Sequence, residues 1–279
     1  MRKLSIIDFG AHLLTSRDLD PIYIALNKCA FDSGTRNRWL TAYCAFYSAG
    51  FACWASEQET AGYWSALHTA AVNEVPTPFG ERWPRSSERR HFRGEQAKKA
   101  IIAWKEKYEE NPECMMEYIS EGAPSFTQTY ERAKQHRSVG AWMGFKLVDL
   151  VDACMGYEID QSDIMLFMYD TPRESLLRRW QEKYQLPATA KPRDEEAVIR
   201  GMVQYYQDIF KDHTIPHKPG KPLDMFCLET IFCKYQSHLN GHYPLYNDID
   251  EITHGLLSWL PYSKNAKLFH QMMPKRNIT

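Results

Sequence analysis

Apolar residues recur at helical spacing along almost the whole sequence, and this periodicity constrains the fold more than any other feature. A repeat of about 3.6 residues indicates amphipathic helices, whereas a half-buried strand would show strict alternation. Proline and glycine separate the periodic segments, as expected where helices end. The segments that fit the helical period are 18–30, 35–57, 68–73, 95–110, 114–120, 125–135, 139–155, 173–184, 194–213, 223–239 and 249–259.

These segments predict an all-α fold, because no run of alternating β-branched residues accompanies them. The chain of 279 residues is long enough to bury a substantial core. The loops at 75–94, 186–193 and 214–222 are too short to be convincing domain linkers. We therefore expect a single helical domain spanning residues 1–279.

The charge balance excludes a protein that binds nucleic acid through a global basic field. The chain carries 34 basic and 35 acidic residues, for a formal net charge of −1. Any contact with DNA must therefore come from a local patch. The seven cysteines are scattered without a CxxC pair, which favours reduced thiols in a cytoplasm and predicts no metal centre.

The uncharged segment at 40–56 is the best candidate for a membrane span, and it is too short. A spanning helix needs about 20 apolar residues, and this segment also contains threonine, serine, glycine and tyrosine. Near the N-terminus, Asp8 and His12 interrupt the apolar stretch, which argues against a secretory signal. We expect a cytoplasmic protein with no membrane partner.

The segment HRSVGAWMGFKLVDLVDACMGYEIDQSD, residues 136–163, predicts a helical hairpin followed by carboxylates. Helices at 125–135 and 140–155 are joined by only a few residues. Gly140 opens the second helix, so its first amides are free to face an anion such as a DNA phosphate. We predict that Arg137, Ser138 and Gly140 bind DNA. On spacing alone, an ordinary turn between two bundle helices remains the alternative.

Part of this segment resembles a known DNA-binding unit. The run VGAWMGFKLVDLVDACMGYEID is similar to the helix-hairpin-helix of DNA glycosylases, in which VG opens the second helix and an aspartate follows it. The resemblance implies a helix-hairpin-helix-like unit at 125–172 in a glycosylase-like helical fold. It places Asp160 at the catalytic aspartate and Trp142 at the glycosylase lysine. Tryptophan cannot form a Schiff base, so a covalent amine nucleophile is not expected there.

A closer resemblance covers about 230 residues. Six segments resemble, in the same order, the α-glutamyl/putrescinyl thymine pyrophosphorylases, a family also described as amino acid:DNA transferases. They are SRDLDPIYIALNKC (16–29), RNRWLTAYCAFYSAGFACWASE (36–57), SSERRHFRG (86–94), HRSVGAWMGFKLVDLVD (136–152), IDQSDIMLFMYDTP (159–172) and ETIFCKYQSHLNGHYPL (229–245).

This resemblance implies thymine hypermodification of bacteriophage DNA. A pyrophosphorylated 5-hydroxymethyluracil in double-stranded DNA would lose pyrophosphate as an amino acid or polyamine attaches at the methylene carbon. No cofactor is implied. A pyrimidine stacked in a duplex is hard to reach, so the resemblance also implies that the base is flipped into a pocket.

A cluster of cations fits the departure of pyrophosphate. Guanidinium groups match phosphate oxygens and neutralise the charge that develops on the leaving group. The cluster follows Arg82 and Arg85 and consists of Arg89, Arg90, His91 and Arg93. These side chains could contact the leaving group or the DNA backbone, and each could also be an ordinary solvated charge.

Two carboxylates and one lysine are the catalytic candidates. The resemblance implies that Asp160 stabilises the electron-deficient methylene-uracil or accepts a proton from the incoming ammonium, because an amine attacks only when neutral. Asp163 is the second candidate, and a helix N-cap is its alternative role. Lys146 could contact pyrophosphate or could extend its stem out of the hairpin helix.

The motif ETIFCKYQSHLNGHY places polar residues on a third helix. Lys234 suits the carboxylate and Glu229 the ammonium of an amino acid, with His238 one turn beyond Lys234. In the alternative, Glu229 and Lys234 simply pair with neighbours. A zinc site at His238 and His242 fits poorly, since no third ligand is obvious.

Three functions remain open. The first is the DNA-modifying transferase, and the second is a glycosylase that uses Asp160 to cleave the N-glycosidic bond of a modified or damaged base. The third is a non-catalytic DNA-binding protein. The density of arginines beside a loop favours catalysis.

Overall fold

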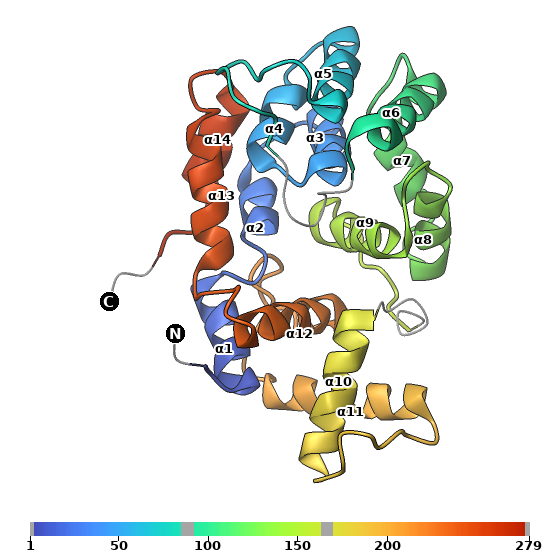
Figure 1. Ribbon diagram of the computed structural model, residues 1–279, viewed down its shortest axis with the longest axis vertical. Coiled ribbons are helices and arrows are strands. Elements are labelled where there is room, and N and C mark those ends of the chain that lie inside the picture. Colours follow the sequence, from blue (N-terminus) through green and yellow to red (C-terminus); the bar gives the residue numbers. More distant parts are fainter. Residues whose placement is uncertain (1–2, 85–91, 163–169, 277–279) are drawn as a thin grey trace. The chain divides into compact units, whose positions relative to one another are not determined.

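The computed structural model describes residues 3–84, 92–162 and 170–276, and these residues fold into helices joined by loops (Figure 1). No β-strand is assigned in those ranges, so the expected all-α class is confirmed. The helices are α1 (Ile6–Ser16), α2 (Pro21–Lys28), α3 (Ser33–Phe46), α4 (Ala49–Ser56), α5 (Thr60–Val72), α6 (Gly94–Tyr108), α7 (Cys114–Ser120), α8 (Phe126–Lys134), α9 (Ala141–Cys154), α10 (Asp170–Lys183), α11 (Glu195–Ile209), α12 (Met225–Leu239), α13 (Asn247–Leu257) and α14 (Lys264–Met272).

The chain forms two compact units. Unit 1 consists of Met1–Pro21, Asp160–Ile249 and Pro274–Thr279, and unit 2 consists of Ile22–Ile159 and Asp250–Met273. A single domain spanning the whole chain stays a prediction.

In unit 2, the long helix expected at 35–57 is divided in two. α3 ends at Phe46, and its C-cap Tyr47 has a left-handed backbone with φ 51°. The Ser48 hydroxyl then accepts a hydrogen bond from the Phe51 amide at the start of α4. The expectation of one continuous helix was therefore wrong. The break lets α3 and α4 pack against each other (Figure 1), with Phe46 and Phe51 in edge contact at 4.9 Å.

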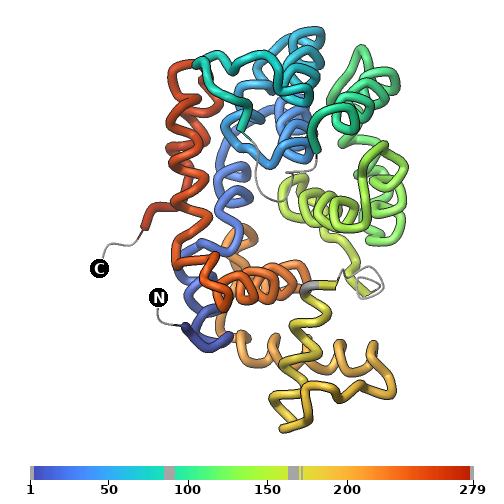
Figure 2. Tube along the Cα trace, viewed as in Figure 1, coloured from blue at the N-terminus to red at the C-terminus, as the bar shows by residue number. Residues whose placement is uncertain are grey.

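Helices α8 and α9 of unit 2 form the expected helical hairpin, and Figure 2 follows the chain through it. Ser125 caps α8 by accepting a hydrogen bond from the Gln128 amide. The two helices approach closely at Gly144, where an added Cβ would lie 3.0 Å from the Tyr130 ring. The hairpin therefore depends on a small residue at this position.

In unit 1, α12 packs against α1, α10 and α11. Aromatic side chains fill these contacts. Phe232 meets Tyr206 of α11 edge-on at 5.0 Å, and His238 lies 4.6 Å from the Phe9 ring of α1. These contacts bury most of α12, which carries the third predicted motif.

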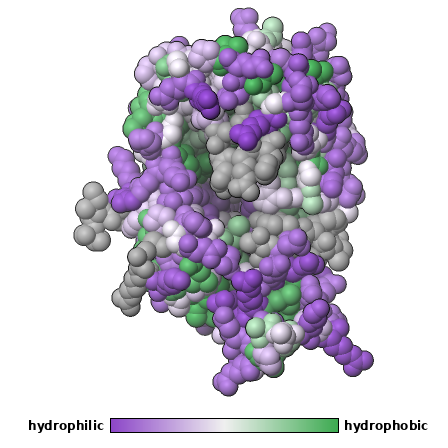
Figure 3. All heavy atoms as spheres, viewed as in Figure 1, coloured by the Kyte–Doolittle hydropathy of each residue, from purple (hydrophilic) through white to green (hydrophobic). Residues whose placement is uncertain are grey.

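Hydrophilic residues cover most of the face drawn in Figure 3, and hydrophobic residues form small separate patches there. Large exposed apolar side chains such as Val75 and Leu257 belong to different helices and loops. Across the described ranges, no helix combines the length and hydropathy that crossing a membrane requires.

Candidate DNA-binding hairpin and polar centres

The turn of the α8–α9 hairpin presents the three residues predicted to bind DNA. Arg137 and Gly140 are exposed, and Ser138 adopts a left-handed backbone with φ 65°. Gly140 is the N-cap of α9, contributes no side-chain hydrogen bond, and has open space where a Cβ would be. The first amides of α9 have no acceptor within the helix. The turn can therefore receive a phosphate oxygen at these amides.

Helix α6 fixes the position of this turn. The Trp104 indole donates to the Arg137 carbonyl at 3.1 Å, and the Tyr108 hydroxyl lies 2.8 Å from His136 Nε2. Burial, reinforced by the nearby Lys107 charge, lowers the pKa of His136, so the ring is neutral near pH 7. A neutral ring donates from Nδ1 to the backbone carbonyls 3.1 Å away and accepts the Tyr108 proton at Nε2.

A buried polar group lies within α9. The Tyr23 hydroxyl of α2 donates to Asp149 Oδ2 at 2.7 Å, and the Lys146 ammonium lies 3.7 Å from the same oxygen. The side chain of Lys146 is 14% exposed and that of Asp149 is 3% exposed. Asp149 thus holds α2 and α9 together through a buried hydrogen bond. A catalytic role for Lys146 stays a prediction.

Side chains from other helices satisfy the C-terminal carbonyls of α9. Asn27 of α2 donates to the Ala153 carbonyl at 2.8 Å, and Arg36 Nη1 of α3 donates to the Cys154 carbonyl at 3.0 Å. Carbonyls at a helix end have no partner within the helix, so these bonds stabilise the C-terminus of α9. Gly156 follows with φ 79°, a left-handed conformation that glycine commonly adopts after the end of a helix.

Asp152 controls the path of the chain after α9. Its buried carboxylate accepts a hydrogen bond from the Ile159 amide at 3.0 Å, which fixes the segment that leads to Asp160. Asp160 itself is exposed, and its Oδ1 accepts from the Ser162 amide at 3.0 Å. The second catalytic candidate, Asp163, lies outside the described residues.

Most of the predicted phosphate-binding cluster also lies outside the described residues, namely Arg89, Arg90 and His91. Arg93 is described and exposed. It immediately precedes α6 and makes no side-chain capping bond to that helix. The phosphate-binding role of all four stays a prediction.

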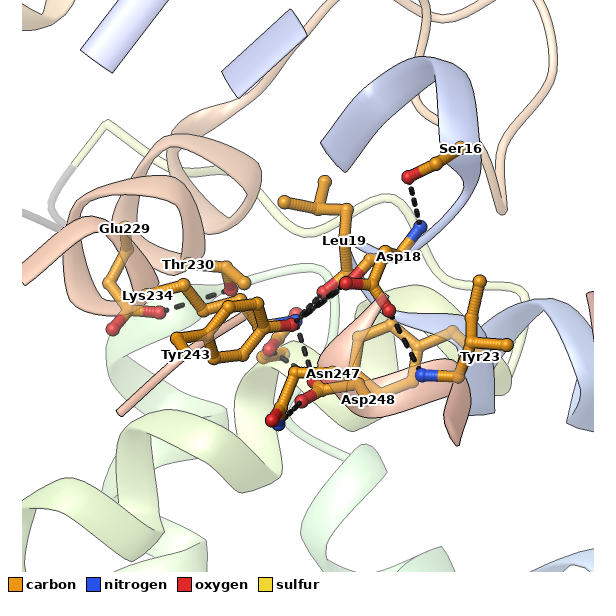
Figure 4. Close-up of polar contacts among 12 residues, drawn as sticks. Ser16, Asp18, Leu19, Tyr23, Glu229, Thr230, Lys234, Tyr243, Asn247 and Asp248 are labelled. Carbon is orange, nitrogen blue, oxygen red and sulfur yellow. Dashed lines mark hydrogen bonds and ion pairs between the residues drawn. The ribbon is translucent and has the colours of Figure 1, made fainter. Parts of the chain in front are cut away.

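Lys234 belongs to a polar centre in unit 1 (Figure 4). Its ammonium lies 2.7 Å from Asp248 Oδ2 and donates to the backbone carbonyls of Asp18, at 3.1 Å, and Leu19. These contacts use all three donors of the ammonium. Burial alone would lower the pKa of Lys234, but the negative charges of Asp248, Asp20 and Asp18 outweigh it and raise the pKa. Lys234 is therefore charged.

The Asp18 carboxylate is fully buried in the same centre. It accepts hydrogen bonds from the Ile249 amide at 2.9 Å and from the Tyr243 hydroxyl at 3.3 Å. Burial raises the pKa of Asp18 to about 6, because removal from water disfavours the charged form more than Lys234 and the hydrogen bonds favour it. Asp18 thus titrates close to neutral pH.

The other two residues of the third motif have partners inside unit 1. Glu229 is fully buried, and the Thr230 hydroxyl donates to it at 3.4 Å. His238 Nδ1 lies 2.9 Å from the Tyr243 carbonyl, while Nε2 accepts from the Leu4 amide at 3.3 Å. Both ring nitrogens are therefore occupied. These contacts favour the structural alternative for this motif, and amino acid binding by it stays a prediction.

Periodicity did not identify Asp18, Tyr243 and Asp248 as members of this centre. Two of the six resembling segments meet here, since 16–29 supplies Asp18 and 229–245 supplies both Lys234 and Tyr243. The only indication in the sequence that these residues belong together was that both segments occur among the six that resemble the family.

Comparison with known proteins identifies the family. The model of the amino acid:DNA transferase family matches residues 7–243. The chain belongs to this family. It is 37% identical over 283 residues to a glycinyltransferase of Pseudomonas phage PaMx11, covering 98% of this chain and 97% of that protein. It is 22% identical over 264 residues to a putrescinyltransferase of Delftia phage PhiW-14, covering 92% of this chain and 79% of that protein.

Membership in the amino acid:DNA transferases confirms the resemblance found in the sequence. The matched region includes the α8–α9 hairpin, Asp160 and the Lys234 centre. The chain is accordingly a transferase that acts on DNA, and the class of its second substrate is an amino acid or amine.

Proposed function

We propose that this transferase attaches an amino acid to pyrophosphorylated 5-hydroxymethyluracil in DNA and releases pyrophosphate. The observation that carries the proposal is the family match over residues 7–243, which reaches into both compact units. The 37% identity to a glycinyltransferase over nearly the full length of both chains supports an amino acid as the second substrate.

The proposed reaction is a substitution at the methylene carbon of the base. The bond from this carbon to the pyrophosphate oxygen breaks, and its electron pair leaves with pyrophosphate. The amine nitrogen forms the new bond to carbon and loses one proton. A general base and a cationic site for the leaving group are therefore required.

Asp160 is our candidate for the base or for the carboxylate that stabilises the electron-deficient methylene carbon. It is exposed, and within the described ranges it pairs with no cation, so its negative charge is available to a substrate. The Asp152–Ile159 hydrogen bond fixes the chain immediately before it. Asp163 remains the second candidate.

The leaving group and the DNA need separate cationic and amide donors. We assign pyrophosphate to Arg89, Arg90, His91 and Arg93, with Lys146 as a further candidate. We assign the DNA backbone to Arg137, Ser138 and Gly140 at the hairpin turn, where uncapped amides and an exposed guanidinium occur together. Base flipping into the protein belongs to the same proposal.

The test uses duplex DNA that carries pyrophosphorylated 5-hydroxymethyluracil. The DNA is incubated with the protein and with amino acids or polyamines in separate reactions, then digested to nucleosides and analysed by mass spectrometry. A nucleoside heavier by the amino acid supports the proposal. Free base with abasic sites would instead indicate the glycosylase, and duplex binding without either product would indicate a non-catalytic DNA-binding protein.

Two variants separate catalysis from folding. Asp160→Asn is expected to abolish or strongly reduce adduct formation while the duplex still binds. Asp212→Asn replaces another exposed aspartate of unit 1 and is expected to retain full activity. Equal activity of the two variants would remove Asp160 from the mechanism.

A further inference from the structure

Unit 2 contains a cavity of about 590 Å³ to which the proposed mechanism assigns no role. The N-terminal part of α3, the end of α7 and the segment after α9 surround it. Its walls combine a guanidinium, carboxylates and an amide with the aromatic side chains of Phe31 and Tyr157. The volume exceeds that of a small amino acid, and the polar groups are few and diverse, as in ligand sites.

Arg36 supplies the positive wall of this cavity. Its Nη1 donates to the Cys154 carbonyl, which anchors the guanidinium at the end of α9. Its Nε is buried without a hydrogen-bond partner, and no carboxylate pairs with Arg36 in the described part of the chain. A guanidinium that retains unused donors is suited to bind a ligand carboxylate.

Asn37 lies beside Arg36 on α3 and is 4% exposed. Its side-chain amide lines the cavity and makes no hydrogen bond to any described residue. The amide atoms are not among the side-chain atoms sealed from solvent without a partner, so they open onto the cavity, where a polar ligand or water can bind them.

Glu117, in α7, supplies the negative wall. It is exposed and forms no ion pair among the residues that the structure describes. The second glutamate at the cavity, Glu121, is already paired with Arg132. A cation and a carboxylate, neither of which forms an ion pair with a described residue, thus line the same cavity on two different helices. A zwitterion complements both charges, whereas a simple anion or cation leaves one of them uncompensated.

We propose that this cavity binds the free amino acid that is transferred to DNA. Its carboxylate contacts Arg36 and Asn37, its ammonium contacts Glu117, and Phe31 and Tyr157 face the aliphatic part. This inference rests on the proposed function, because that function requires a free amino acid.

Tyr157, which lines this cavity, precedes the catalytic candidate Asp160 by three residues in the sequence. A polyamine lacks the carboxylate that Arg36 requires. The cavity therefore favours an amino acid over putrescine as the substrate of this chain.

The first experiment measures amino acid binding by calorimetry, with and without duplex DNA. Glycine, serine and glutamate are titrated separately, and acetate, methylamine and putrescine serve as ligands that carry only one kind of charge. We expect at least one amino acid to bind at least about 10-fold more tightly than each of these three, because a charge-assisted contact is lost in each. No binding of any amino acid, with or without DNA, overturns the proposal.

Variants then locate the site. Glu117→Gln and Arg36→Lys are each expected to weaken amino acid binding by about 10-fold or more. Glu106→Gln, which changes an exposed glutamate of α6 outside the cavity, is expected to bind like the wild type. Thermal melting checks that each variant is folded. Glu117→Gln keeps the test decisive if Arg36→Lys disturbs the end of α9. Wild-type affinity in folded Glu117→Gln overturns the proposal.

The transfer reaction distinguishes this inference from the proposed function. The yield of adduct is measured against amino acid concentration for wild type and for Glu117→Gln. If the two proteins show the same dependence, the cavity assignment is wrong and the proposed function still holds. Amino acid binding that Glu117→Gln weakens, without any adduct on the correct DNA, supports the cavity and overturns the function. If Lys234→Met abolishes binding while the cavity variants retain it, the amino acid site belongs to unit 1 and this proposal is wrong.

Discussion

Replacing Lys234 with methionine tests whether the polar centre of unit 1 stabilises the fold. Methionine keeps most of the apolar stem but removes the ammonium that contacts Asp248 and two backbone carbonyls. Removing one partner of a buried ion pair typically costs about 3–5 kcal/mol. The lysine side chain is 13% exposed and that of Asp248 is 27% exposed, so we expect about 3 kcal/mol, at the lower end of this range.

Urea unfolding, followed by circular dichroism, measures this loss. The expected decrease in the free energy of unfolding corresponds to a midpoint about 1 M lower if the slope is about 3 kcal/mol/M and does not change. Lys211→Met is the matched control, because Lys211 is an exposed lysine of unit 1, and it should change stability by less than about 0.5 kcal/mol. A free energy of unfolding for Lys234→Met within about 0.5 kcal/mol of wild type would refute the reasoning.

Three further predictions concern stability and DNA binding. Burial raises the pKa of Asp18 from 3.8 to about 6, so between these pH values the folded state binds more protons than the unfolded state. The contribution of Asp18 to stability is therefore greatest below pH 4. It falls as the pH rises to 6, by up to about 3 kcal/mol. Asp18→Asn should remove this decline in urea titrations across that window, and an unchanged pH profile would contradict the assignment. Gly144→Val places a side chain against Tyr130 and should destabilise the protein by about 1–3 kcal/mol, which would lower the melting temperature. An unchanged melting temperature would show that α8 and α9 separate easily. Arg137→Ala should weaken binding to duplexes of any sequence and reduce the salt dependence by about one phosphate contact, and an unaltered slope in salt titrations would remove Arg137 from the interface.

The hairpin was predictable because its determinants are local. Glycine at the start of α9, an amphipathic run and glycine after its end are neighbours in the sequence, and each has a direct backbone consequence. The break between α3 and α4 was not predictable in this way. Tyr47 adopts a left-handed backbone that non-glycine residues rarely take, and its ring packs against Tyr43 and Trp142, a residue distant in the sequence.

Two terminal helices, α1 and α14, were missed although their sequences contain helical signals. In α1, Asp8 and His12 interrupt the apolar pattern, although Ser5 caps the helix and contacts Asp8. Helix α14 is short and polar and begins at a Ser263 cap. The buried residues nonetheless follow the helical period, with Ile6, Phe9 and Leu13 on one face of α1 and Ala266 and Phe269 on one face of α14, so the sequence did contain this signal.

The polar centre of unit 1 and the cavity of unit 2 show why such sites cannot be predicted from the sequence alone. Lys234 contacts Asp18 across 216 positions of sequence, and Arg36 meets Cys154 across 118. No local pattern contains this information. The sequence identified Lys234 as important through its motif, but only the structure supplies its partners.

The most direct test of the account is the stoichiometry of transfer. The wild type is incubated with ¹⁵N-labelled glycine, serine and glutamate in separate reactions on DNA carrying pyrophosphorylated 5-hydroxymethyluracil, and released pyrophosphate and labelled nucleoside are quantified together. The account predicts one pyrophosphate for each ¹⁵N-labelled nucleoside with at least one of these amino acids, and loss of both products in Asp160→Asn. Pyrophosphate released without any labelled nucleoside, or abasic sites in place of an adduct, would contradict it.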